Sequence, residues 1–105
     1  MCLEFSNDEF VKEIRYPTVF SCLFQQLVRS ACSIGANVVE AKAGSTKKDW
    51  RSFYKIALKS ANESKYWLCL IRDTMSVDKV AVGELLTEAN EISKIIASII
   101  TNARD

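Results

Sequence analysis

The stretch VGELLTEANEISKIIASIITNA, residues 82–103, decides the fold. Its apolar residues follow one another at alternating steps of three and four, which places them on one face of an α-helix. A stripe of this kind is buried against antiparallel neighbours at the shallow crossing angle of helical bundles. Ser76 is a candidate N-cap, and Asp78 adds a favourable negative charge to the first turn. The stripe consists of Val82, Leu85, Ala89, Ile92, Ile96, Ile99 and Ala103.

A second helix is predicted from about Thr46 to Asp73. Thr46 and Asp49 resemble a capping box at its start, with aspartate in place of the usual glutamate, and Ser45 is an alternative cap. Its apolar stripe carries large residues at both ends and small residues in the middle, so another helix can approach closely there. The stripe consists of Trp50, Phe53, Ala57, Ala61, Ser64, Leu68 and Ile71.

A third helix is predicted from about Thr18 to Ala43. Pro17 suits its first turn, because proline is tolerated there and hinders the preceding residue from continuing a helix. Gly44 suits its end. The apolar face consists of Phe20, Leu23, Leu27, Ala31, Ile34 and Val38.

A short helix is predicted over about Phe5 to Arg15, where Phe10, Val11 and Ile14 form an apolar patch. The other helices are joined by short connections, and short connections make consecutive helices alternate in direction. The predicted fold class is therefore all-α. We expect residues 1–105 to form one domain, an antiparallel up-down-up-down four-helix bundle with a short first helix.

The composition agrees with a small helical domain and disfavours catalysis. Of the 105 residues 49% are hydrophobic and 26% charged, and there are only one proline and three glycines, too few for a fold of many short strands. The absence of histidine removes the commonest general base and metal ligand. We expect no enzymatic activity, no metal and no cofactor.

The cysteines and the first residues predict an intracellular setting. The four cysteines contain no C-x-x-C pair, so we expect buried, reduced thiols rather than a zinc site. The opening MCLEFSNDEF lacks the basic start and apolar run of a signal peptide. No window of about 18 apolar residues occurs, so we predict a cytoplasmic protein without a membrane partner. The cysteines are Cys2, Cys22, Cys32 and Cys69.

A polar seam follows the predicted helix over residues 18–43, with Arg29 alongside it. Amphipathicity alone favours a solvated face. The alternative is a buried hydrogen-bond network, because Ser60, Glu63 and Ser64 occupy polar positions on the helix over residues 46–73. Burial of Arg29 or Glu40 would require a charged partner. The seam consists of Gln26, Ser30, Ser33, Asn37 and Glu40.

Basic residues concentrate in the middle of the chain. Residues 42–73 hold eight basic and three acidic side chains, a net charge of +5, whereas each flanking segment carries −2. A stripe of basic residues at helical spacing extends for about 16 Å along the outer side of one helix. The stripe is either a solvated face or, in an assembly that adds several stripes together, a surface that binds nucleic-acid phosphates. It consists of Lys48, Arg51, Lys55 and Lys59.

Residues 26–41, QLVRSACSIGANVVEA, resemble the QLxRSxxSIxANxxEA motif of the four helix bundle protein family, also called the 23S ribosomal RNA intervening-sequence protein family. Residues 53–68 are similar to the family's third-helix pattern, and the resemblance covers about residues 18–100. It implies a small bacterial four-helix bundle that assembles as a homopentamer. The family motif maps onto Arg29, Ser33, Asn37, Glu40 and Glu63.

The resemblance also implies possible partners. Some relatives are encoded inside intervening sequences of ribosomal RNA genes. A related branch, the accessory variability protein of diversity-generating retroelements, has a basic surface that binds nucleic acid and a reverse transcriptase. The leading hypothesis is a nucleic-acid-associated accessory module that binds RNA or DNA. The alternatives are a structural ring that recruits a protein partner such as a reverse transcriptase, and a small-molecule carrier. The chain departs from the family at its front, where the first helix is short and a neighbouring subunit is expected to cover Phe20 or Leu23.

Overall fold

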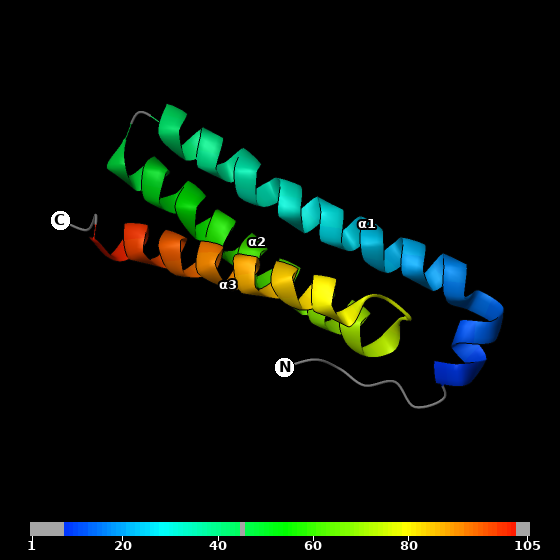
Figure 1. Cartoon of the computed structure of the whole chain (residues 1–105). Coiled ribbons are helices and arrows are strands. Elements are labelled where there is room, and N and C mark those ends of the chain that lie inside the picture. Colours follow the sequence, from blue (N-terminus) through cyan, green and yellow to red (C-terminus); the bar gives the residue numbers. More distant parts are fainter. Residues whose placement is uncertain (1–7, 45, 103–105) are drawn as a thin grey trace.

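The computed structural model describes residues 8–44 and 46–102, with side chains described from Thr18 onward. These residues form three helices and no strand: α1 (Asp8–Ala43), α2 (Lys47–Thr74) and α3 (Lys79–Asn102). Consecutive helices run in opposite directions, so α1 and α3 point the same way on either side of α2 (Figure 1). The all-α prediction and the alternating directions of these helices are confirmed. None of the described helices has both the length and the apolarity that crossing a bilayer requires.

The helix starts are fixed by short polar side chains. The backbone of Thr46 is extended, with φ −124° and ψ 155°, and its hydroxyl accepts a hydrogen bond of 3.0 Å from the Asp49 N–H. This is the predicted N-cap of α2. The cap of α3 was predicted wrongly: Asp78, not Ser76, accepts from two N–H groups of the first turn, those of Val80 at 3.0 Å and Ala81 at 3.3 Å.

The predicted start of a helix at Pro17 is wrong, because α1 continues through this residue from Asp8. Proline lacks an N–H and its ring crowds the preceding turn, so a helix that passes through one bends. Figure 1 shows the dark-blue first turns of α1 bending away from the rest of the helix. The predicted short helix therefore merges with α1 over residues 8–15, and its first residues, 5–7, lie outside the described part. The four-helix bundle stays a prediction.

The core lies along α2, which packs against α1 on one side and α3 on the other. Among the described residues, no Cα atom of α1 lies within 8 Å of a Cα atom of α3. The small residues in the middle of α2 are fully covered, with Ala57 and Ala61 both 0% exposed. They allow the close approach predicted from the sequence. The buried residues of α2 are Tyr54, Ala57, Ser60, Ala61, Ser64, Leu68, Leu70, Ile71 and Thr74.

The apolar stripe of α3 is buried along only one of its sides. Val82, Ala89 and Ile96 are buried against α2, whereas Leu85 is 48% exposed and Ile92 is 39% exposed. Leu85 and Ile92 line the hollow between α1 and α3, where the described residues cover them only in part. The sequence periodicity predicted the apolar face of α3 correctly. It did not predict that one side of this face is exposed.

Candidate functional site

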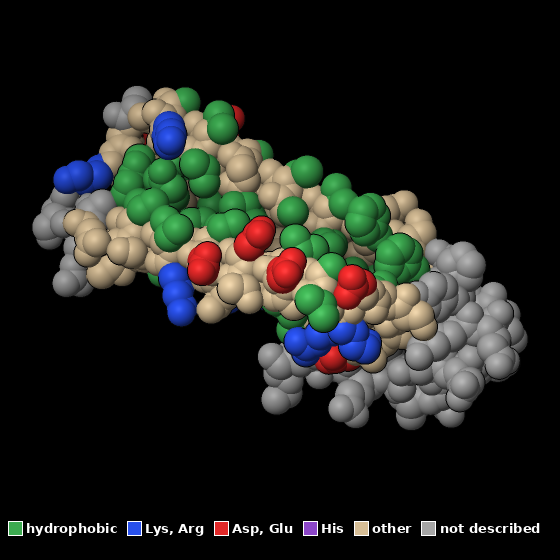
Figure 2. Space-filling model, viewed as in Figure 1, with side chains coloured by type: hydrophobic (Ala, Val, Ile, Leu, Met, Phe, Trp, Pro, Cys, Tyr) green, Lys and Arg blue, Asp and Glu red, His purple; other side chains and the backbone are tan. Residues whose placement is uncertain are grey.

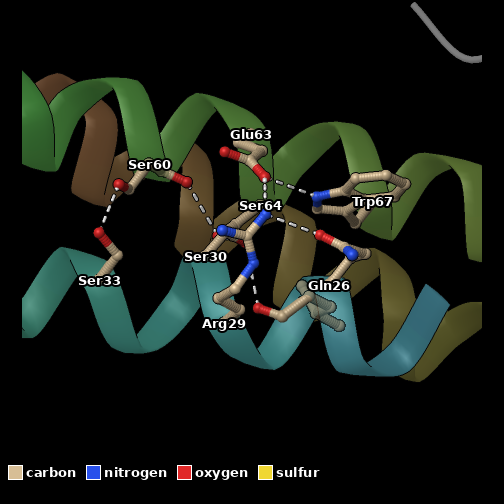
Figure 3. Close-up of polar contacts among 9 residues, drawn as sticks. Gln26, Arg29, Ser30, Ser33, Ser60, Glu63, Ser64 and Trp67 are labelled. Carbon is tan, nitrogen blue, oxygen red and sulfur yellow. Dashed lines mark hydrogen bonds and ion pairs between the residues drawn. The ribbon is translucent and has the colours of Figure 1, made fainter. Parts of the chain in front are cut away.

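The polar seams of α1 and α2 meet and form a hydrogen-bond network. The hydroxyls of Ser30 and Ser64 lie 2.8 Å apart and are both buried. One turn further along, Ser60 donates to Ser33 over 2.9 Å (Figure 3). Asn37 continues the chain of bonds, since its amide donates to the Ser33 carbonyl at 2.8 Å and to the Ser33 hydroxyl at 3.1 Å. Hydrogen bonds therefore link these four serines and Asn37 along the contact between α1 and α2.

The network satisfies its own polar groups. The Ser64 hydroxyl is 3.0 Å from the Ser60 carbonyl and the Ser30 hydroxyl is 3.1 Å from the Leu27 carbonyl. Since each hydroxyl has one proton, one serine donates to the other, and the serine that accepts donates to the backbone carbonyl in its own helix. Among the described residues, no buried side-chain nitrogen or oxygen lacks a hydrogen-bond partner. A satisfied buried network favours one pairing of two helices over slipped alternatives, because a shift in register would leave hydroxyls unpaired.

We expect Ser64→Ala to lower the free energy of unfolding by about 1 kcal/mol, because Ser30 loses its cross-helix partner inside the core. The double variant Ser30→Ala/Ser64→Ala should cost clearly less than the sum of the two single changes, since it removes both ends of the same bond. Urea unfolding of the wild type, Ser30→Ala, Ser64→Ala and the double variant gives the four free energies of this double-mutant cycle. Strictly additive losses would show that the two hydroxyls are not coupled.

Arg29 and Glu63 form an ion pair at the edge of this network. Their closest nitrogen and oxygen atoms are 3.8 Å apart, and the side chains are 72% and 41% exposed. Arg29 also donates to Gln26 at 2.8 Å, and the Trp67 indole donates to Glu63 at 3.1 Å (Figure 3). Such an exposed pair contributes about 0–1 kcal/mol, so it orients these side chains more than it stabilises the fold.

Two features of this edge differ from the sequence analysis. Glu40 is exposed and takes no part in the network among the described residues, so neither it nor Arg29 is a buried charge. Trp67 was not predicted as a member. Its place four residues after Glu63 was the available signal, because residues at that spacing share a helix face.

The basic stripe lies on the side of α2 that faces away from the core. Lys48, Lys55 and Lys59 are exposed, and Arg51 is half-buried. No acidic residue occurs between Asp49 and Glu63 in the sequence, so the stripe is positive along most of its length. With about 1.5 Å of rise per residue, its ends are about 16 Å apart, which lets the cations follow successive phosphates of a backbone.

The described residues contain no candidate metal site. No group of three or more cysteine, aspartate or glutamate side chains in this part of the chain is placed to hold a metal ion. Cys22, Cys32 and Cys69 are free thiols, as expected. The prediction that they are buried is wrong for Cys22 and Cys32, which are exposed on α1, and Cys2 lies outside the described residues.

An apolar groove runs between α1 and α3 with α2 as its floor. Figure 2 shows hydrophobic side chains along the strip between these helices, with acidic side chains following α3 at its edge. Two adjoining hollows make up the groove and share Ile34 and Ile92. None of the four residues of the basic stripe on α2 lines the groove. Its α1 wall includes Leu27, Val28, Ala31, Ile34, Val38 and Lys42, and its α3 wall includes Leu85, Glu88, Ala89, Ile92, Ile95, Ile96 and Ile99.

Fold and site together define a small helical bundle protein with a serine-linked helix pair, a basic outer face and an open apolar side. The family model for the 23S rRNA-intervening sequence protein matches residues 9–98, which is most of the chain. The chain therefore belongs to the 23S rRNA-intervening sequence protein family.

A solved structure agrees with this assignment. The chain is similar to a protein with unknown function from the S23 ribosomal protein family of Bacteroides thetaiotaomicron, whose crystal structure superposes with a TM-score of 0.73. The two sequences are 37% identical over 75% of this chain and 70% of that chain. No curated protein matches this chain.

Proposed function

We propose that the protein is a non-enzymatic accessory or scaffold module that binds nucleic acid through the basic stripe of α2. The observation that carries the proposal is the run of Lys48, Arg51, Lys55 and Lys59 on the outer side of one helix, without an acidic residue between positions 49 and 63. Side chains of this kind displace counterions from a phosphate backbone without reading its sequence. We further propose that the protein acts in the cytoplasm.

The phosphate contacts of one stripe are too few for tight binding, so the proposal includes an assembly. Resemblance to the family's pentameric rings supports a homopentamer, in which five stripes would contact one nucleic acid together and avidity would raise the affinity. The accessory variability protein of diversity-generating retroelements, a related branch of the family that the chain resembles, supports RNA or DNA as the ligand and a reverse transcriptase as a protein partner. A mass five times 11.8 kDa in sedimentation would support the ring.

The proposal predicts strongly salt-dependent binding that disappears with the stripe. A protein that makes four phosphate contacts to duplex DNA loses about 100-fold in affinity when the salt concentration rises from about 50 to about 200 mM. Changing the four stripe residues to glutamine, which keeps a comparable helix propensity, should remove most of this binding and its salt dependence. Labelled RNA and DNA are titrated at both salt concentrations, and circular dichroism verifies the fold.

A matched control removes the same number of charges elsewhere. It changes three lysines and one arginine to glutamine outside the stripe, and it should retain most of the affinity. No binding by the wild type at low salt, or equal losses in the two variants, would overturn the proposal. The control carries Lys65→Gln, Arg72→Gln, Lys79→Gln and Lys94→Gln.

A second candidate function is a self-assembling scaffold that recruits a protein and binds no nucleic acid. The open apolar side of the bundle favours it, since Leu85, Ile92 and Ile95 remain 48%, 39% and 60% exposed in a single chain. A four-helix bundle would place another helix over these residues. Pull-down of a reverse transcriptase by a protein that fails to bind RNA and DNA would favour this candidate.

A further inference from the structure

We propose that a hollow between α2 and α3 receives one unstacked base of a single-stranded nucleic acid whose phosphates lie along the basic stripe. The inference rests on the proposed function and narrows its ligand to RNA or DNA with unpaired bases. The stripe supplies most of the contacts, and the hollow adds the contact with one base. Four residues of α2 and two of α3 line this base hollow: Asn62, Lys65, Tyr66, Cys69, Leu86 and Asn90.

The base hollow continues the face of α2 that carries the basic stripe. Asn62 follows Lys59 by three residues and Tyr66 follows Asn62 by four, so these side chains share one side of the helix. Asn62 lies about 4.5 Å further along the helix axis than Lys59, the last cation of the stripe. A strand that contacts Lys55 and Lys59 through its phosphates therefore reaches the hollow with its next nucleotides.

The base hollow has the size of a site for a small organic group. Its volume is about 410 Å³, and ligand pockets commonly measure about 300–1,000 Å³. Asn62 and Asn90 are exposed, and the other four lining residues are half-buried. A partly exposed hollow of this kind suits a base that a strand lying outside carries into it.

The two asparagines of the base hollow have amide nitrogens available to donate. The side-chain carbonyl of Asn62 accepts from the Ser93 hydroxyl at 3.3 Å, and that of Asn90 accepts from the Lys65 ammonium at 3.4 Å. Because each carbonyl is already engaged, each amide nitrogen is left to donate to a ligand. The Tyr66 hydroxyl is a further donor, and the described residues that line the hollow include no carboxylate. Donors of this kind match the carbonyl oxygens on the edges of thymine or uracil.

Tyr66 supplies an aromatic ring on which a base can stack. Its ring contacts that of Trp67 edge to face, with centroids 4.9 Å apart and planes at 69°. The Trp67 indole in turn donates to Glu63 at 3.1 Å, which holds the pair of rings in place (Figure 3). One base stacked on an aromatic side chain raises the affinity about tenfold.

The base hollow acts on single strands and not on duplexes. The bases of a duplex are paired and stacked, and moving one of them out of the helix costs free energy. The cations of the stripe contact phosphates of either form. We therefore expect the hollow to add affinity only where a base is already unpaired.

Affinities for three ligands of equal length at low salt test the proposal: oligo(dT), a DNA strand of abasic sites, and duplex DNA. The wild type should bind oligo(dT) about tenfold more tightly than the abasic strand, which has the same phosphates but no bases. Tyr66→Leu should remove this preference and leave the affinities for the abasic strand and the duplex unchanged. The matched control is Phe24→Leu, since Phe24 is 50% exposed on α1 and does not line the hollow. It should keep the preference.

Equal affinities of the wild type for oligo(dT) and the abasic strand would overturn the proposal and leave the proposed function intact. The same holds for a preference that Tyr66→Leu does not change. Absence of binding to all three ligands would overturn the proposed function itself, and this inference with it.

Asn62→Asp tests the amide donor separately. Aspartate keeps an acceptor for the Ser93 hydroxyl but replaces the donor by a negative charge. The preference for oligo(dT) over the abasic strand should be lost in this variant and retained in Asn102→Asp, the same change at an exposed position near the end of α3. Circular dichroism verifies that each variant is folded. A full preference in folded Asn62→Asp would contradict the seating of the base beside Asn62.

Discussion

Replacing Ile96 by alanine is expected to lower the free energy of unfolding by about 2–5 kcal/mol, the usual cost of a cavity in a core that cannot collapse around it. Ile96 is 4% exposed and belongs to the buried cluster that also contains Ala41, Tyr54 and Ala57. This cluster draws on all three helices, since Ala41 lies on α1, Tyr54 and Ala57 lie on α2, and Ile96 lies on α3. Loss of the isoleucine would therefore loosen both sides of α2.

The control for this change is Val80→Ala, because Val80 lies on the same helix and is 72% exposed. Its effect should stay within about 0.5 kcal/mol. Urea unfolding followed by circular dichroism, at one protein concentration, compares the two variants with the wild type. Equal losses would contradict the burial of Ile96 and with it the packing of α3 against α2.

Replacing Ala57 by leucine should cost about 1–3 kcal/mol for the opposite reason, which is overpacking. Ala57 is 0% exposed, so a larger side chain has no space unless α2 moves away from a neighbour. Such a movement would also stretch the hydrogen bond between Ser60 and Ser33.

Ala36→Leu provides the matched control for overpacking, because it adds the same side chain at an exposed position of α1. It should change the unfolding free energy by no more than about 0.5 kcal/mol. If Ala57→Leu is as stable as this control in urea unfolding, the helices are not in close contact at this position.

Local signals predicted the helix ends well wherever a single residue decides them. Gly44 follows the end of α1 and Thr46 caps α2, as the sequence indicates. Ser76 and Asp78 are both good caps two residues apart, and the sequence alone does not distinguish them. At Pro17 the same kind of signal failed. Proline can end a helix or bend it, and the local sequence does not distinguish the two outcomes.

The candidate site was predictable to the extent that it follows helix faces. The seam of Ser30, Ser33 and Asn37 and its partners Ser60 and Ser64 were all found from spacing. The pairing of these residues across the two helices could not be found in this way, because periodicity gives the face of each helix but not the register between two helices. For the same reason the sequence predicted an apolar stripe through Ile92 without predicting that this side chain stays 39% exposed in the described structure.

If the proposed function is right, phosphate binds to the outer side of α2, away from the groove. Amide chemical-shift mapping with a short RNA or DNA at low salt tests this most directly, because it reports on every helix at once. We expect chemical-shift changes that are concentrated in residues 47–59 and that become smaller as the salt concentration is raised. Shifts concentrated along Val28, Ala31 and Ile92 in the groove, or no shifts at low salt, would contradict it.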